Sequence, residues 1–132
     1  MIEEYRFGLI TIDGKTYNHD VEVRWLQKRF PHDTQGIPGE VLEWQRTESH
    51  IVNIKDVERA LEQSPEVIVI GTGESGSMEV AEGTPDEIIS RGIKLIINAT
   101  EDAIKTFNII NEESEEEEGR QRRVIGLFHL TC

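Results

Sequence analysis

The sequence has little of what marks a secreted, membrane-spanning or disulfide-bonded protein. Its 132 residues include one cysteine, Cys132, so no intrachain disulfide can form, which favours a reducing compartment, and we expect the cytoplasm. No apolar run approaches the roughly 20 residues of a membrane-spanning helix, so no membrane insertion is expected. Glu3 and Glu4 stand where a secretory leader is basic, and we therefore expect no such leader.

Positive charge is also scarce. Lysine and arginine total 14 against 26 aspartate and glutamate residues, which gives a formal net charge of −12 and a pI near 4.7. A protein that binds nucleic acid normally carries a positive stripe to neutralise phosphates, so we expect no nucleic-acid partner. Aromatic residues make up only 6% of the chain, but 36% hydrophobic content suffices for one core, and the length fits a single domain over residues 1–132.

The first 25 residues predict a β-hairpin. Residues alternate on both sides of Asp13-Gly14, and this dipeptide is the favoured pair for a tight type I′ turn. The alternation fails over residues 26–39, where prolines and glycines predict a long loop, and a short strand is expected at residues 40–44. The alternating residues are Phe7, Leu9 and Thr11 before the turn and Tyr17, His19, Val21, Val23 and Trp25 after it.

The rest of the chain alternates between strand and helix patterns. Asn53, Thr84 and Thr100 are predicted to cap three helices, and a proline follows Thr84 at the first helical position. β-Branched runs typical of strands buried on both faces occupy residues 67–70 and 93–97, and a last strand is expected at residues 124–130. This order predicts an α/β fold with a largely parallel core, to which the hairpin is added.

Residues 112–118 contain six glutamates and account for half of the net charge. Because glutamates oppose the negative end of a helix, we expect a solvated loop here. Basic residues follow, at Arg120, Arg122 and Arg123, and can serve as counterions. A recognition segment for a basic partner is the alternative interpretation.

Gly71-Thr72-Gly73-Glu74-Ser75-Gly76 matches G-x-G-x-x-G directly after a buried strand. Dinucleotide binding needs a helix that begins within the glycines and directs its amides at the pyrophosphate, whereas the next helix start is Thr84. We therefore expect no dinucleotide cofactor, an irregular or extended segment over residues 77–83, and a loop that turns the chain or lines a small pocket.

Such a pocket has physical support. Ligands of open α/β sheets favour the carboxyl ends of strands, and two predicted ends lie at the glycine loop and just before Thr100. Free amides in this loop and a capped helix start suit a small anion. Arg46 and His50 suit a carboxylate, whereas Trp44 beside them is more typical of a core. The candidate ligand-binding residues are Gly71, Thr72, Gly73, Glu74, Ser75, Gly76, Thr100, Arg46 and His50.

Signals for catalysis or metal binding are weak. His129 and Cys132 are residue types that bind metals or form a nucleophile pair, but they point to opposite faces of a regular strand. No second local pair supplies further ligands. We assign no catalytic residue, no metal ligand and no cofactor.

Several segments together resemble one family, and the ending Arg123 to Cys132, which reads RVIGLFHLTC, is the most specific of them. The others are Tyr5-Arg6-Phe7-Gly8, the segment from Trp44 through Arg46 to His50, residues 67–73, and residues 100–108. Over nearly its whole length the chain resembles the Mth-like domain proteins. These include archaeal and bacterial single-domain members, the adipogenesis-associated Mth domain-containing protein and a mitochondrial complex I assembly factor. The departures from the family pattern are residues 26–35 and 112–118.

The resemblance implies a compact three-layer α/β fold around a mixed central sheet. It brings no established catalytic residues, and its animal relatives act through protein partners. The leading hypothesis is therefore a non-enzymatic binding or assembly module with protein partners. The alternative is a small-molecule or anion-binding protein, or an enzyme, that uses the pocket at residues 71–76. A homo-oligomer is compatible with the sequence but not indicated by it.

Overall fold

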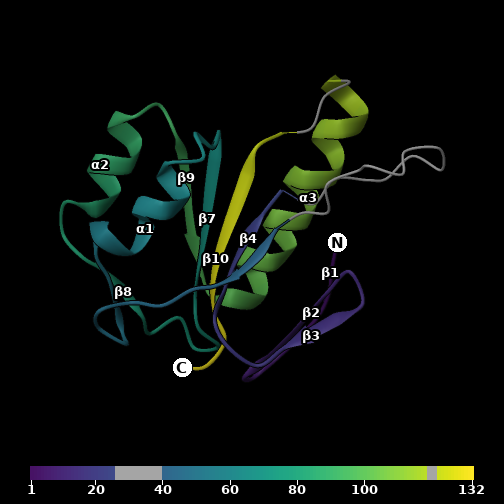
Figure 1. Ribbon diagram of the computed structural model, residues 1–132, viewed down its shortest axis with the longest axis horizontal. Coiled ribbons are helices and arrows are strands. Elements are labelled where there is room, and N and C mark those ends of the chain that lie inside the picture. The colour runs from purple at the N-terminus through teal and green to yellow at the C-terminus, as the bar shows by residue number, and fades with distance from the viewer. Residues whose placement is uncertain (26–39, 119–121) are drawn as a thin grey trace.

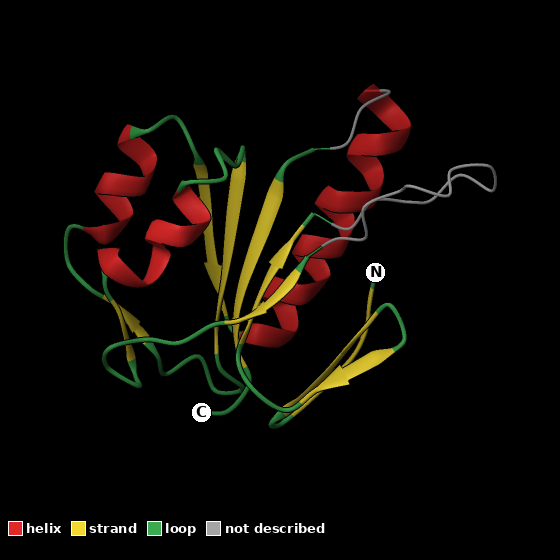
Figure 2. Ribbon diagram, viewed as in Figure 1, coloured by secondary structure: helices red, strands yellow, loops and turns green. Residues whose placement is uncertain are grey.

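A mixed five-stranded sheet forms the centre of the computed structural model, which describes residues 1–25, 40–118 and 122–132 (Figures 1 and 2). The strand order is β5-β4-β10-β7-β9. β7 runs parallel to β10 and β9, whereas β4 runs antiparallel to β10 and β5. The predicted α/β class with a mixed central sheet is therefore confirmed. The strands are β4 (Val21–Arg24), β5 (Val41–Glu43), β7 (Val67–Thr72), β9 (Lys94–Asn98) and β10 (Val124–His129).

Helices cover both faces of this sheet. α1 (Ile54–Leu61) and α2 (Thr84–Ser90) lie on one face, and α3 (Thr100–Glu118) lies on the other (Figure 1). Successive residues of a strand point to opposite faces, so β7 supplies Val67 and Val69 to the core under α3, and Ile68 and Ile70 to the core under α1 and α2. All six residues of β7 are buried, as its β-branched run predicts.

The N-terminal residues form a separate antiparallel sheet of three strands, β1 (Ile2–Arg6), β2 (Leu9–Ile12) and β3 (Lys15–Tyr17). The turn at Asp13-Gly14 is confirmed, with φ of 48° and 83°. The prediction of one hairpin added to the central sheet is too simple. A turn at Phe7-Gly8 separates β1 from β2, and the second predicted strand breaks before β4. A two-stranded parallel pair, β6 (Ile51–Val52) and β8 (Glu79–Val80), completes the strands of the described residues.

Two of the predicted helix caps are wrong. The N-cap of α2 is Gly83, with φ of 86°, and Thr84 is the first helical residue. α3 likewise begins at Thr100, whose hydroxyl bonds to distant residues instead of capping the helix. Asn53 is the N-cap of α1 as predicted, and its N–H donates to the Asp56 carboxylate over 2.8 Å. At Thr100 the tertiary hydrogen bonds take the hydroxyl that a cap would need.

The prediction of a loop at residues 112–118 is also wrong, because α3 continues to Glu118. Glutamate has a high intrinsic helix propensity, and the unfavourable interaction with the helix dipole is only about 0.3–1 kcal/mol per exposed charge. Propensity therefore outweighs the dipole here. The predicted loop at residues 26–39 and the basic residue Arg120 lie outside the described residues.

β9 is not buried on both faces as predicted. It is the last strand of the central sheet, and Lys94, Ile97 and Asn98 are exposed. A short apolar run does not distinguish an edge strand from an inner one, because the pattern reports the faces of a strand and not its edges.

In the described part of the chain, no helix has the length and apolar character needed to cross a membrane.

Candidate functional site

The carboxyl end of β10 carries a buried histidine that is held by an aspartate just before β4. His129 is 4% exposed, and its Nδ1 lies 2.7 Å from Asp20 Oδ2. The Leu130 N–H donates to Asp20 Oδ1 over 2.8 Å. Because β4 and β10 are antiparallel neighbours, the residue before β4 meets the end of β10. The sheet register thus brings together two residues that are 109 positions apart.

Arg46 joins Asp20 and His129, and we call these three residues the His129 cluster. Its Nη1 lies 2.7 Å from Asp20 Oδ2 as an ion pair, although the N–H is not aligned for a hydrogen bond. Its Nη2 donates to the Ser49 carbonyl over 2.9 Å, and its guanidinium carbon lies 4.6 Å from the centre of the Trp44 ring. Trp44 is buried as predicted and orients Arg46 through a cation–π contact.

Both ring nitrogens of His129 face acceptors. Nδ1 faces Asp20, and Nε2 lies 2.8 Å from the backbone oxygen of Cys132, so both can donate only when the ring is an imidazolium. The hydrogen bond to Asp20 raises the pKa of His129, burial opposes this shift, and the bond to Cys132 adds to it. Burial alone would raise the pKa of Asp20, but interactions with His129, the Leu130 amide and Arg46 outweigh burial and lower it. The cluster therefore favours a charged His129 beside a charged Asp20.

Thr100 links the ends of β7 and β10. Its buried Oγ1 accepts the Gly73 N–H over 2.8 Å and donates to the His129 carbonyl over 2.6 Å. A Cβ on Gly71 would lie 2.8 Å from this oxygen, so only glycine allows the close approach. The Thr100 hydroxyl therefore connects the ends of two parallel strands to the first turn of α3 through tertiary hydrogen bonds.

The residues after β10 fasten two loops to this end of the sheet. The Leu130 carbonyl accepts the Gly8 N–H over 2.8 Å and the Tyr5 hydroxyl over 3.1 Å, and the Thr131 carbonyl accepts the Glu74 N–H over 2.9 Å. Burial, with help from nearby carboxylates, raises the pKa of Tyr5 to about 12, which keeps its hydroxyl a donor. The 130–132 segment thus joins the turn between β1 and β2 to the glycine loop.

The predicted pocket residues lie around this end of the sheet, but many of their polar groups already have partners. In the glycine loop, the amides of Gly73, Glu74 and Gly76 donate to protein oxygens, and Thr72 Oγ1 donates to the Asn98 carbonyl. Ser75 is exposed, and its hydroxyl pairs with that of Ser77. These bonds hold the loop to the rest of the chain.

Arg46 and His50 both come to His129. The exposed His50 ring packs edge-on against the His129 ring, with centroids 6.1 Å apart. A Cβ on Gly73 would in turn lie 3.1 Å from His129 Cδ2, so the two predicted groups and the loop share His129 as a neighbour. Ligand binding by these residues stays a prediction.

The glycine loop does not have the surroundings of a dinucleotide site. Helix α2 begins at Thr84, and residues 77–83 are extended or turning, as predicted. The Thr131 carbonyl lies 2.5 Å from where a Gly73 Cβ would stand, so the space in front of Gly73 is filled by the chain itself. In dinucleotide-binding folds the equivalent space admits the pyrophosphate.

Sequence reasoning missed Asp20. It lies at a polar position within the alternating run from Tyr17 to Trp25, and many surface acids occupy such positions. Among the described residues, no three His, Cys, Asp or Glu side chains are grouped to hold a metal ion.

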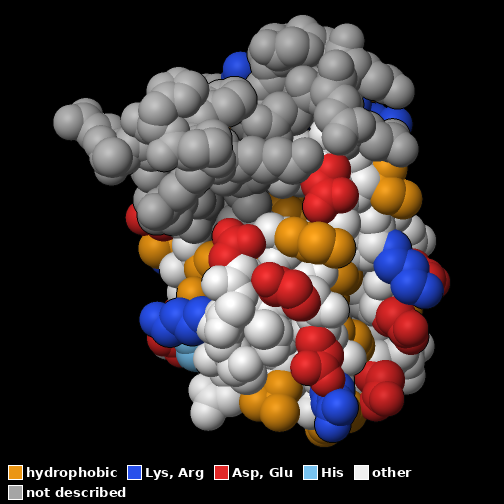
Figure 3. All heavy atoms as spheres, turned by 90° about the vertical axis from the view of Figure 1, so that its right-hand side faces the viewer, with side chains coloured by type: hydrophobic (Ala, Val, Ile, Leu, Met, Phe, Trp, Pro, Cys, Tyr) orange, Lys and Arg blue, Asp and Glu red, His pale blue; other side chains and the backbone are white. Residues whose placement is uncertain are grey.

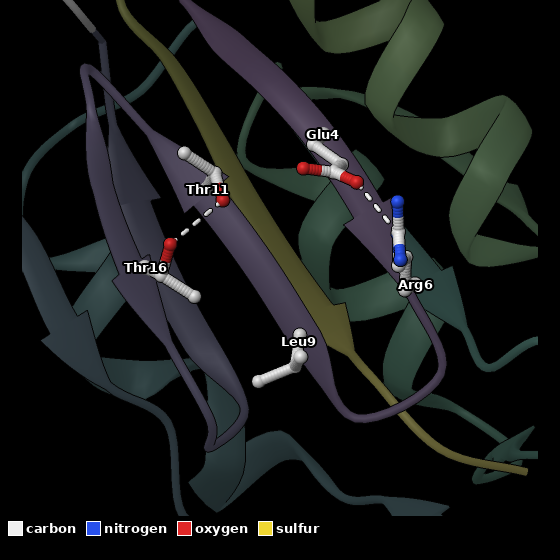
Figure 4. Close-up of a pocket in the computed structure, with 5 residues that line it drawn as sticks. All are labelled: Glu4, Arg6, Leu9, Thr11 and Thr16. Carbon is white, nitrogen blue, oxygen red and sulfur yellow. Dashed lines mark hydrogen bonds and ion pairs between the residues drawn. The ribbon is translucent and has the colours of Figure 1, made fainter.

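A second candidate surface is a shallow depression of about 280 Å³ on the outer face of the N-terminal sheet (Figure 4). Glu4 and Arg6 of β1 form an ion pair of 2.6 Å on one side, and Thr11 and Thr16 form a cross-strand hydrogen bond of 2.9 Å on the other. Leu9 projects beside them and is 43% exposed. The depression thus combines both charges, hydroxyl groups and an apolar side chain.

These features define a class of protein: an α/β domain with a mixed sheet. One end of the sheet is closed by a buried histidine that is paired with an aspartate beside an arginine, and by the segment after the central strand. The chain belongs to the family described as protein of unknown function (DUF498/DUF598), whose model matches residues 2–129. The resemblance to the Mth-like domain proteins is thereby confirmed.

Solved structures support the family fold. The chain is 25% identical in sequence to the conserved hypothetical protein PH1505 from Pyrococcus horikoshii OT3. The match spans 100% of this chain and 99% of that chain, and the two structures superpose with a TM-score of 0.71. With the protein MT938 the identity is 25%, the coverage 100% and 98%, and the TM-score 0.66. An outer membrane protein from Bartonella henselae shares the fold at 21% identity, with coverage of 99% and 94% and a TM-score of 0.70.

Proposed function

We propose that the protein is a non-enzymatic binding module that acts through a protein partner. The observation that carries this proposal is the turn between β1 and β2, where Phe7 and Leu9 are 54% and 43% exposed. Between them, the Gly8 N–H donates to the Leu130 carbonyl over 2.8 Å. Two large apolar side chains therefore project from a turn that is held in place, so little conformational freedom is lost when a partner covers them.

The surroundings of this turn have the composition of an interface rim. The depression beside Leu9 supplies the Glu4–Arg6 ion pair and the hydroxyl groups of Thr11 and Thr16 (Figure 4). Figure 3 views the molecule from the side of α3 and the N-terminal sheet, where exposed apolar side chains lie among carboxylates and basic groups. An apolar centre with a polar rim is the usual arrangement of a protein–protein contact.

The His129 cluster supports binding more than catalysis. His129 is 4% exposed, and its two nitrogens are engaged by Asp20 and the backbone of Cys132. A general acid or base must reach the proton that it moves. The cluster instead holds the 130–132 segment, which holds the Phe7–Leu9 turn. The resemblance to Mth-like proteins with partner-based roles favours the same interpretation.

The test is affinity capture from native lysate with three forms of the chain. The double variant Phe7→Ser/Leu9→Ser removes the apolar turn, and Ile89→Ser is the matched control, because Ile89 is 56% exposed on α2, on the other side of the central sheet. We expect the wild type and Ile89→Ser to retain the same protein and the double variant to lose it, with equal melting temperatures. Equal capture by all three forms, or capture by none, contradicts the proposal.

A further inference from the structure

The outer edge of β9 is an unpaired strand edge. The Lys94 N–H donates to the Glu66 carbonyl over 3.0 Å, and Lys94 is in register with Val67 of β7. In a parallel ladder only alternate residues bond to the neighbouring strand. Lys94, Ile96 and Asn98 therefore direct their backbone groups to β7. The N–H and C=O of Leu95 and Ile97 point away from the sheet, where no described strand meets them.

Other strand edges of the molecule are blocked by side chains. The Asn108 amide donates to the Ile2 carbonyl over 2.9 Å and accepts the Ile2 N–H over 3.0 Å, which closes the edge of β1. Arg59 donates to the Glu43 carbonyl of β5 over 2.7 Å. No side chain in the described part of the chain bonds to the outer edge of β9 in this way. Proteins normally protect such edges, because an open edge is a template for another strand.

The charge of β9 suits a second copy of the same chain. Two copies each carry a net charge of −12 and repel one another over most of their surfaces. β9 reads Lys-Leu-Ile-Ile-Asn and contains no acidic residue, and its Ile97 is 39% exposed. The strand itself therefore brings no carboxylate to the contact and offers apolar surface to bury.

We propose that β9 pairs antiparallel with β9 of a second copy about a two-fold axis at Ile96, which joins the two central sheets. Leu95 and Ile97 of each copy then exchange main-chain hydrogen bonds with Ile97 and Leu95 of the other. This register places Lys94 of one copy directly opposite Asn98 of the second copy, on the α3 side of the sheet. The contact is isologous, so each cross-strand pair forms twice.

This register predicts opposite effects on the dimer Kd for a negative and a positive side chain at residue 98. Asn98 is exposed, and its backbone carbonyl, not its side chain, accepts the bond from Thr72. Asn98→Glu places a carboxylate opposite Lys94 of the second copy and should lower the dimer Kd roughly two- to thirtyfold, because two symmetry-related pairs form. Asn98→Lys places like charges opposite each other and should raise the Kd by a similar factor.

Net charge alone predicts the reverse order. Asn98→Glu makes each copy more negative and Asn98→Lys makes it less negative, so general repulsion would weaken the first dimer and strengthen the second. The same two substitutions at Gln45, an exposed residue just after β5, are the matched controls for net charge. The Kd of each variant is measured by sedimentation equilibrium over a concentration series that extends to the millimolar range.

Amide hydrogen exchange gives a second measurement on the unmodified chain. The Leu95 and Ile97 amides should exchange fast at low concentration and become protected as the dimer forms, whereas the Ile96 amide is protected throughout by its bond to β7. A chain that stays monomeric at all concentrations overturns the proposal. So does a dimer whose Asn98 variants follow the net-charge order, or whose formation leaves exchange at Leu95 and Ile97 unchanged.

Discussion

His129 lies at the centre of the residues that hold one end of the sheet, and the hydrogen bond to Asp20 raises its pKa, which favours the imidazolium form. A core histidine is more commonly neutral, but here both ring nitrogens have an acceptor within 2.8 Å. Arg46 Nη2 lies 3.1 Å from His129 Nδ1, so when His129 is protonated two cations converge on the single carboxylate of Asp20. Such an arrangement is stable only while Asp20 is charged, since a buried cation without a partner is strongly destabilising.

This cluster predicts how stability depends on pH. The pKa of His129 is raised on folding, so its contribution is complete below the unfolded value of about 6.5 and is lost as pH rises through the folded value. The pKa of Asp20 is lowered, so its contribution is present above about 3.9 and is lost as pH falls through the folded value. The free energy of unfolding, measured by urea denaturation, should fall on both sides of this window.

His129→Gln tests the alkaline limb, because glutamine keeps hydrogen-bonding groups but does not titrate. At about pH 6 we expect it to lower the free energy of unfolding by about 1.5–3 kcal/mol, and the loss of stability toward higher pH should largely disappear. His50→Gln is the control, because His50 is exposed and should shift stability by less than about 0.5 kcal/mol. An unchanged alkaline slope in His129→Gln would show that another group titrates there.

At the scale of elements, the glycine loop and the segment after β10 form one unit. The loop has the spacing of a nucleotide fingerprint, but its glycines serve close approach between chain segments. Gly71 lies against Thr100, and Gly73 lies against Thr131 with φ of 101°. Glycines at the same spacing therefore serve close packing between chain segments here, and not the approach of a phosphate as in a phosphate-binding loop.

Gly73→Ala should therefore be much more destabilising than alanine at an open glycine. Gly92 is the matched control, since its φ is also positive, at 78°, but nothing lies within 4 Å of the position that an alanine methyl group would take there. Backbone strain alone should cost about 1–2 kcal/mol at Gly92. At Gly73 the contact with the Thr131 carbonyl should add about 1–3 kcal/mol. Thermal or urea denaturation measures both, and equal losses would mean that the 130–132 segment does not pack on the loop in solution.

At the scale of the whole molecule, elements from distant parts of the sequence share the end of the sheet where the two strands β7 and β10 finish. The turn between β1 and β2, the segment after Trp44, the glycine loop and the start of α3 all meet the 130–132 segment or His129. Ligands of α/β sheets favour this end. Here the chain occupies it with its own residues.

This occupancy predicts that nicotinamide dinucleotides do not stabilise the protein. A ligand at a hundredfold excess over its Kd raises the free energy of unfolding by about 2.7 kcal/mol, which gives a clear rise in melting temperature. With NAD or NADP we expect no rise, because the Gly73 and Glu74 amides already donate to Thr100 and Thr131. Differential scanning fluorimetry over a range of dinucleotide concentrations checks this, and a saturable rise would contradict it.

The sequence predicted the parts of the fold that depend on local chemistry. The β-branched run of β7 predicted a strand buried on both faces, and all six residues of β7 are buried. Asp13-Gly14 adopts the positive φ values of a type I′ turn. The late start of α2, which set the glycine loop apart from a nucleotide site, also followed from local signals around Thr84. In each case neighbouring residues determine the backbone conformation.

Only the tertiary structure decided which residues meet. Whether β9 is an inner or an edge strand depends on strand order, and strand order depends on contacts that local periodicity does not encode. Thr100 looked like a helix cap, but its hydroxyl joins Gly73 to His129. Asp20 carried no local signal, because its role comes from the pairing of β4 with β10. Backbone sterics act between neighbours in sequence, whereas burial, hydrogen bonding and charge pairing act between neighbours in space.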